Sequence, residues 1–148
     1  MAVALLDVSV LIALFHAGHV HHDVAHDWLA DHGDAGWASC PLTENGLLRI
    51  LSHPARVDPH VPLPDLLQRL TSFCEHSRHQ FWTDDLSFRD VKRFNMAAVR
   101  GHQQLTDVYL LGLAVEHDAR FVTFDRGVPL AAVKGATKKH LKALAAAE

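Results

Sequence analysis

The stretch Val3-Ala4-Leu5-Leu6-Asp7-Val8-Ser9 decides the fold, because a short apolar run ends there in a single carboxylate. The residues before Asp7 are continuously apolar, which is typical of a strand covered on both faces. From Val8 to Phe15, the apolar side chains at positions 8, 11, 12 and 15 have the spacing of one helix face. We therefore expect Asp7 to lie where a buried strand passes into a helix. In open α/β sheets, this is the edge that binds ligands.

Strands and helices are expected to alternate along the rest of the chain. The apolar pattern predicts strands at Val3–Leu6, Trp37–Ser39, Gln80–Trp82 and Arg120–Phe124. It predicts helices over Val8–Phe15, His22–His32, from Pro41 to a stop before Pro54, over Asp65–Ser77 and from a Thr106 cap to His117, with a helix or turn over Leu86–Phe94. Near the end, Lys138–Ala147 fits a helix by pattern, whereas His140–Leu144 fits an edge strand by architecture. This alternation indicates an α/β fold whose mostly parallel sheet is flanked by helices.

The composition is that of a single globular domain spanning residues 1–148. The formal net charge of -3 argues against nucleic-acid binding through a bulk positive field, although a local basic face remains compatible with it. No apolar run approaches the ~20 residues that span a bilayer, and the N-terminus has no signal-peptide pattern. Cys40 and Cys74 fit no metal or disulfide spacing. A cytoplasmic protein that does not engage the membrane is the default expectation.

Four acids are predicted to reach the same edge of the sheet. Asp7 and Asp125 each follow an apolar strand, while Glu44 and Asp107 lie in the first turn of a helix and share its apolar face. Any one of them, taken alone, is explained as well by helix capping. Four carboxylates at one edge would repel one another without a cation, and oxygen ligands favour Mg²⁺ or Mn²⁺. Such a site would serve phosphoryl chemistry.

Four stretches of the sequence resemble the signature blocks of PIN-domain ribonucleases, and most of all those of VapC-type toxins from bacterial toxin–antitoxin pairs. These are Leu5–Leu14, Cys40–Arg49, Gln104–Leu110 and Val122–Gly127, and they occur in the family's order along the whole chain. The resemblance implies a PIN-like (Rossmann-like) five-stranded sheet with helices on both faces. It also favours the strand at His140–Leu144.

The resemblance further implies a metal-dependent endoribonuclease, the toxin of a type II system, with an acidic Mg²⁺ or Mn²⁺ site. The family's catalytic acids map onto Asp7, Glu44, Asp107 and Asp125. Asp7, Glu44 and Asp107 are expected to bind the metal directly or through water, and Asp125 to complete the pocket. Supporting roles are expected for Ser9, Thr43 and Thr123; Ser9 stands where the family often has Asn. An RNA substrate, a protein antitoxin and a homodimer are the implied partners.

The basic residues whose loops adjoin the acidic edge are the candidates for RNA contact. Arg100 and His102 precede Asp107, and Arg126 follows Asp125. Contacts of this kind go to phosphates, so they are sensitive to salt and carry little sequence information.

Two other functions compete with the nuclease. The pair His22 and His26 has the H-x-x-x-H spacing of a zinc site on one helix face, although chance matches are common in a chain with 13 histidines. A zinc-binding protein or hydrolase is therefore one alternative, and a non-catalytic α/β binding module whose acids are only caps is the other. A haloacid-dehalogenase-like enzyme would need a second acid where Ser9 stands.

Overall fold

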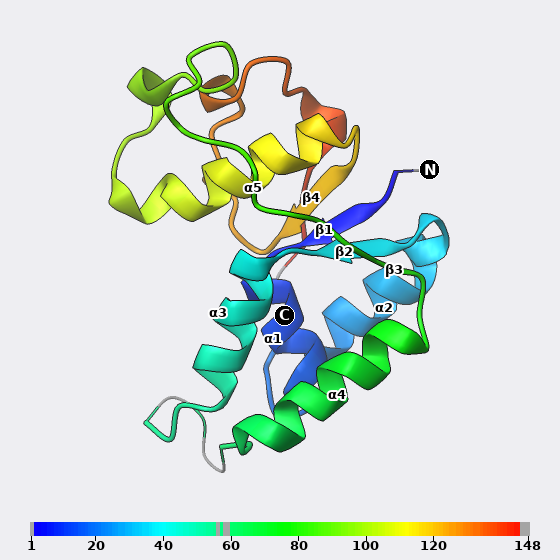
Figure 1. The fold of residues 1–148 in the computed structure, drawn as a ribbon. Coiled ribbons are helices and arrows are strands. Elements are labelled where there is room, and N and C mark those ends of the chain that lie inside the picture. The colour runs from blue at the N-terminus through cyan, green and yellow to red at the C-terminus, as the bar shows by residue number, and fades with distance from the viewer. Residues whose placement is uncertain (1, 56, 58–59, 146–148) are drawn as a thin grey trace.

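The computed structural model describes residues 2–55, 57 and 60–145, which form an α/β fold around one five-stranded sheet (Figure 1). The strand order is β3-β2-β1-β4-β5, and every neighbouring pair is parallel. The strands are β1 (Ala4–Leu6), β2 (Trp37–Ser39), β3 (His79–Phe81), β4 (Arg120–Thr123) and β5 (Leu141–Ala143). The expected parallel α/β architecture is thereby confirmed.

Helices cover both faces of the sheet and create two hydrophobic clusters. One face carries α1 (Val8–Phe15), α2 (His22–His32), α3 (Pro41–Leu51) and α4 (Leu63–Glu75), and the other carries α5 (Leu105–Glu116) (Figure 1). Successive side chains of β1 point to opposite faces of the sheet. Ala4 and Leu6 pack with the first group of helices, and Leu5 packs with α5. None of the helices in the described part of the chain combines the length and apolarity needed to cross a bilayer.

The junction between β1 and α1 has the expected form. Asp7 is the N-cap of α1, and its side chain accepts a hydrogen bond from the backbone N–H of Val8. The buried residues of α1 are nevertheless Val10, Leu11, Ala13 and Leu14, so Leu11 alone of the predicted face is fully buried, and Val8, Ile12 and Phe15 are half-buried. Neighbours on more than one side explain the difference, because α1 packs against both α2 and α3.

Several element boundaries differ from the sequence prediction. Strand β3 lies one residue earlier than Gln80–Trp82, because Trp37 pairs with His79; Trp82 instead packs in the α5-side cluster. Helix α4 begins two residues before Asp65, with a proline in its first turn, where proline is tolerated. Over Leu86–Phe94, predicted as a helix or a turn, the structure has turns and irregular chain, so the turn alternative is confirmed.

The predicted Thr106 cap of α5 is wrong. The helix begins at Leu105, its N-cap residue is Gln104, and no side chain caps it. A 3-10 turn, His102–Gln104, runs directly into α5, so the chain is already helical before it reaches Thr106. The segment between Gly101 and Thr106 is therefore mostly helical.

The C-terminal ambiguity resolves in favour of a strand. Residues 141–143 pair in parallel with β4, in the register Phe121↔Leu141, and a 3-10 turn over Lys138–His140 precedes them. Pairing with the open edge of β4 outweighs the local helical pattern. The alternative was a helix over Lys138–Ala147, and the last two residues of that range lie outside the described residues.

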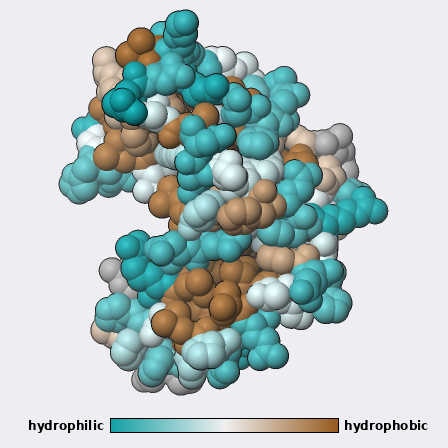
Figure 2. Space-filling view, in the orientation of Figure 1, coloured by the Kyte–Doolittle hydropathy of each residue, from teal (hydrophilic) through white to brown (hydrophobic). Residues whose placement is uncertain are grey.

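Helix α4 keeps part of its apolar surface open to solvent. The side chains of Leu63 and Leu67 are 54% and 52% exposed, while Leu66 and Leu70 on the same helix are buried. Figure 2 shows hydrophobic surface in the lower half of the molecule, where Figure 1 places α3 and α4. The apolar surface of α4 therefore extends beyond the side chains that pack into the core of the described chain.

Gly46 sets the distance between α1 and α3. A Cβ atom added there would lie 2.6 Å from Cγ2 of Val8, closer than side chains normally approach one another. Val8 directly follows Asp7, and Gly46 lies two residues after Glu44, so this contact fixes the spacing of two elements that carry predicted site residues.

We expect Gly46→Ala to destabilise the protein, although alanine is the better helix former by about 1 kcal/mol. Overpacking against the stiff, β-branched Val8 should outweigh that gain and lower the free energy of unfolding by about 1–2 kcal/mol net. Chemical denaturation measures the change. Asn45→Ala, at an exposed neighbouring position of α3, is the control and should be neutral or stabilising. A Gly46→Ala variant as stable as the control would contradict the close contact.

Candidate functional site

Asp7 is a buried carboxylate with three hydrogen-bond donors around it. Its side chain is 7% exposed. Oδ1 accepts from the backbone N–H of Val8 at 2.8 Å, and Oδ2 accepts from the hydroxyls of Ser9 at 3.0 Å and Thr123 at 2.7 Å. Burial raises the pKa of Asp7, and these hydrogen bonds oppose that rise. The carboxylate is therefore fixed in position at the carboxyl ends of β1 and β4.

Asp107 and Asp125 are brought to the same place. The pKa of Asp107 is raised to about 8, first by burial and then by the charge of Asp7 and by a hydrogen bond and charge interaction with Asp125. The charge of Asp125 also raises the pKa of Asp7. Asp125 is held by its own loop, since its Oδ1 accepts from the N–H of Gly127 at 2.7 Å. These three aspartates, from the junction of β1 and α1, from α5 and from the loop after β4, form one electrostatic group.

Glu44 lies at the start of α3 but has different partners. Its Oε2 accepts a hydrogen bond from the hydroxyl of Ser39 at 2.6 Å, and the same hydroxyl is 2.7 Å from Nε2 of His79. Burial lowers the pKa of His79, and the charge of Glu44 opposes that shift; the pKa of Cys74 on α4 is raised to about 11, first by burial and then by the charge of Glu44. The Glu44 carboxylate therefore faces the α4 side of the sheet edge. Thr123, in contrast, lies two residues after Phe121 on β4 and so shares the face of the sheet that α5 covers.

The predicted supporting residues occupy two different places. Ser9 and Thr123 both donate to Asp7, and Thr123 Oγ1 also accepts from the N–H of Asp125 at 3.0 Å. Thr43 is fully buried and instead forms a capping box with Cys40 at the start of α3. Thr43 thus holds the helix that carries Glu44, and Ser9 and Thr123 hold the aspartates.

The basic candidates lie on two loops that are joined to each other. Arg100, His102 and Arg126 are all exposed. Gln104 links their loops: its Oε1 accepts from the N–H of Arg100 at 2.8 Å, and its Nε2 donates to the carbonyl of Gly127 at 3.3 Å. The loops before Asp107 and after Asp125 are therefore held side by side.

Sequence reasoning missed Ser39, His79 and Gln104. Ser39 ends a strand next to the predicted acid, and that position could have drawn attention to it. His79 and Gln104 reach the site only through strand pairing and loop packing, for which the local sequence carries no signal.

The donor set suits a hard divalent cation. The three aspartates offer only carboxylate oxygens. Burial, and then the charges of Asp7 and Asp125, raise the pKa of Asp107, and a bound cation would relieve this cost of ionisation. Within residues 2–55, 57 and 60–145, no three His, Cys, Asp or Glu side chains are grouped as a self-sufficient metal site. Mg²⁺ does not require such a group, because it is usually held by one or two carboxylates and several waters.

The H-x-x-x-H pair has a structural role. Nδ1 of His22 lies 2.7 Å from the carbonyl oxygen of Ala13, and Nε2 of His26 lies 2.8 Å from that of Leu14. These carbonyls are in the last turn of α1, where backbone acceptors lack helical partners. The two rings therefore attach α2 to the end of α1, and the nitrogens so engaged are not directed at a shared ion.

Comparison of the sequence with known proteins identifies its family. The family model described as PIN domain matches residues 4–135. The chain belongs to the PIN-domain family. Ribonuclease VapC44 of Mycobacterium tuberculosis (strain ATCC 25618 / H37Rv) is 46% identical over 144 residues, covering 95% of this chain and 99% of that protein. Ribonuclease VapC29 of the same strain is 44% identical over 124 residues, covering 84% of this chain and 86% of that protein.

A third relative from that strain, Ribonuclease VapC38, is 37% identical over 125 residues, again covering 84% of this chain and 86% of that protein. The resemblance to VapC-type proteins that was expected from four short stretches is thus confirmed over nearly the whole chain. The PIN domain of this protein includes all four predicted acids within its matched range.

We expect Asp107→Asn to stabilise the metal-free protein, increasingly so as the pH rises. The folded protein holds a proton on Asp107 up to about pH 8, whereas the pKa of an unperturbed Asp carboxyl is 3.8. The native state therefore binds more protons than the unfolded state between these values, and the stability of the parent protein falls as pH rises through that window. Asparagine carries no such penalty.

Thermal unfolding in EDTA from pH 5 to pH 9 measures this effect. The melting temperature of the variant should rise above that of the parent by about 2–4 °C for each kcal/mol of repulsion removed, and the gap should widen with pH. Asp65→Asn, at an exposed position on α4, should give no such widening. A difference that is constant with pH would contradict the raised pKa of Asp107.

Proposed function

We propose that this chain is a metal-dependent endoribonuclease, the toxin component of a type II toxin–antitoxin system. The observation that carries the proposal is the meeting of Asp7, Asp107 and Asp125 at the carboxyl edge of a PIN-domain sheet. Support comes from 46% identity, over 95% of the chain, to a protein named Ribonuclease VapC44. We take residues 1–148 as a single PIN domain, since both hydrophobic clusters pack on one sheet.

We assign Asp7, Glu44, Asp107 and Asp125 as the catalytic and metal-holding acids, with Mg²⁺ or Mn²⁺ as the ion. Asp7, Asp107 and Asp125 interact with one another, while Glu44, at the start of α3, is hydrogen-bonded to Ser39 and is assigned on its place in the family pattern. When bound, a divalent cation neutralises charge on phosphate oxygens and makes water a better nucleophile towards phosphorus.

The residues of the chain prepare the site for that chemistry. Ser9, Thr123 and the N–H of Val8 hold the Asp7 carboxylate in one orientation. The carboxylate would therefore reorient little when a metal ion binds. Asp107, with its raised pKa, keeps a proton near neutral pH while the acids are uncompensated and releases it when positive charge arrives. The loop hydrogen bond from Gly127 keeps Asp125 turned towards this group.

RNA is the proposed substrate, bound through local positive charge. The net charge of -3 leaves no general attraction for a polyanion, so contact depends on Arg100, His102 and Arg126 beside the acids. Gln104 joins the loops that carry these residues and so maintains a common surface for the phosphate backbone. Binding of this kind weakens steeply with salt.

We further propose a protein antitoxin and a homodimer as partners, in the cytoplasm. The exposed apolar side of α4, with Leu63 and Leu67, together with exposed parts of α2, is the surface that suits a protein partner. This part of the proposal rests on family resemblance and on that apolar surface.

The test is RNA cleavage by Asp7→Asn. Asparagine retains an oxygen for the Val8 N–H, is a good N-cap, and carries no charge at a position whose burial raises the carboxyl pKa. We therefore expect a folded variant with near-parental stability. Its cleavage of RNA in Mg²⁺ or Mn²⁺ should fall by more than about 100-fold, beyond the effect of losing an outer-shell partner.

The control variant is Asp65→Asn, which removes an exposed acid of α4 and should cleave as the parent does. Cleavage is followed on a labelled single-stranded RNA, with and without EDTA. Undiminished, metal-dependent cleavage by Asp7→Asn would refute the assignment of these acids. Absence of cleavage by the parent protein in either metal would favour the non-catalytic alternative.

A further inference from the structure

A chain of two hydrogen bonds connects the edge strand to Glu44. The hydroxyl of Ser39 is fully buried and donates to Glu44 Oε2 at 2.6 Å, while Nε2 of His79 lies 2.7 Å from the same hydroxyl oxygen. Among the hydrogen bonds of the described residues, Ser39 is the donor to the Glu44 carboxylate. The orientation of Glu44 therefore depends on how the Ser39 hydroxyl is turned.

The number of available protons sets the direction of the second bond. A serine hydroxyl has one proton and two acceptor lone pairs. Because Ser39 gives its proton to Glu44, its oxygen can only accept from His79. His79 must then carry a proton on Nε2, which makes it the donor at the head of the chain. This arrangement turns the hydroxyl proton towards Glu44.

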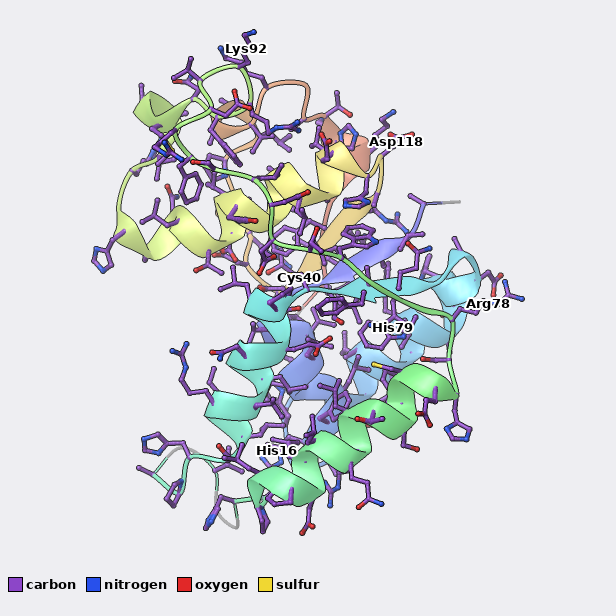
Figure 3. All side chains as sticks on the ribbon, viewed as in Figure 1. His16, Cys40, Arg78, His79, Lys92 and Asp118 are labelled. Carbon is purple, nitrogen blue, oxygen red and sulfur yellow. The ribbon has the colours of Figure 1, made fainter. Side chains whose placement is uncertain are left out.

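The sheet holds the imidazole of His79 in place. His79 pairs with Trp37 across the β2–β3 ladder, so both side chains are on the same face, and their ring centroids are 4.5 Å apart. Figure 3 shows His79 beside β3 on the side of the sheet that carries α4. A ring packed on a buried tryptophan is a rigid donor, unlike a side chain free in solvent.

We propose that His79 is a positioning residue for Glu44, acting through Ser39. The His79 Nε2–H···Ser39 Oγ–H···Glu44 Oε2 chain fixes one carboxylate oxygen on the α4 side, so that in the proposed function Oε1 is the oxygen that would serve the metal. The inference rests on the proposed function, in which Glu44 is one of the metal-holding acids. Outer-shell partners of this type typically change metal affinity or activity by about 10–100-fold when they are removed.

The experiment compares variants that separate ring packing from hydrogen bonding. His79→Phe keeps an aromatic ring against Trp37 and removes the N–H, His79→Gln keeps an N–H at similar reach, and Ser39→Ala removes the relay hydroxyl. His32→Phe is the matched control, because His32 also stacks on a tryptophan, Trp28, at 5.0 Å, but on α2 away from Glu44.

Two readouts are taken: the dissociation constant of Mn²⁺, measured by electron paramagnetic resonance, and the kcat for RNA cleavage. His79→Phe and Ser39→Ala should weaken Mn²⁺ binding and lower kcat by about 10-fold or more, and His79→Gln should recover most of the loss. In a Glu44→Gln background, His79→Phe should have no further effect on either quantity, because the relay then has no carboxylate to position. His32→Phe should match the parent.

A third readout is independent of metal and activity. The ¹⁵N chemical shifts of His79 should show a protonated Nε2 in the metal-free parent at pH 8. Unprotonated Nε2, or parental Mn²⁺ affinity and kcat in His79→Phe, would overturn the proposal. An equal additional loss for His79→Phe in the Glu44→Gln background would also overturn it, because the effect would then not pass through Glu44.

The Asp7→Asn variant, included in the same series, separates this proposal from the proposed function. If Asp7→Asn cleaves RNA as the parent does, the nuclease assignment fails whatever the histidine does. If Asp7→Asn is inactive while His79→Phe is unimpaired, the positioning role alone fails.

Discussion

The buried carboxylate of Asp7 is the constraint on which the rest of the site depends. A charge removed from water must be hydrogen-bonded or paired, and Asp7 meets this demand with donors from Val8, Ser9 and Thr123. These donors come from two places far apart in sequence, the start of α1 and the end of β4, which meet because β1 and β4 are parallel neighbours. The pairing that builds the sheet thus also builds the first acid of the site.

The same burial makes the neighbouring acids costly to ionise together. Asp107 begins a helix on the α5 side, and its pKa is raised to about 8 by burial and by Asp7 and Asp125. A fold held together only for its own stability gains nothing from three carboxylates in this arrangement. Their grouping is understandable if a cation completes it, and it links the protein's stability, proton binding and metal binding into one equilibrium.

Much of this arrangement could be predicted from the sequence, because acids at strand ends and helix starts are local features. The positions of Asp7 and Asp107 follow from periodicity, since one follows a short apolar strand and the other lies on the apolar side of a helix start. The direction in which Glu44 points could not be predicted. It is decided by Ser39 and by His79, which arrives through the pairing of β2 with β3. Cross-strand register is not encoded in either strand alone.

The boundaries that differed have the same cause. Local signals placed a cap at Thr106 and allowed a helix near the C-terminus, but a preceding 3-10 turn and the open edge of β4 determined those segments. The zinc-like spacing of His22 and His26 was likewise a local pattern with a tertiary explanation, because both rings bond carbonyls of α1. Spacing motifs gain meaning only when the partners of each side chain are known.

The most direct test of a cation at the three aspartates is anomalous diffraction from crystals soaked in Mn²⁺. The account predicts one strong manganese peak about 2.0–2.3 Å from carboxylate oxygens of this aspartate group, and its loss in crystals of Asp7→Asn. A peak at the His16–His26 segment instead, or none at the aspartates at saturating Mn²⁺, would contradict it.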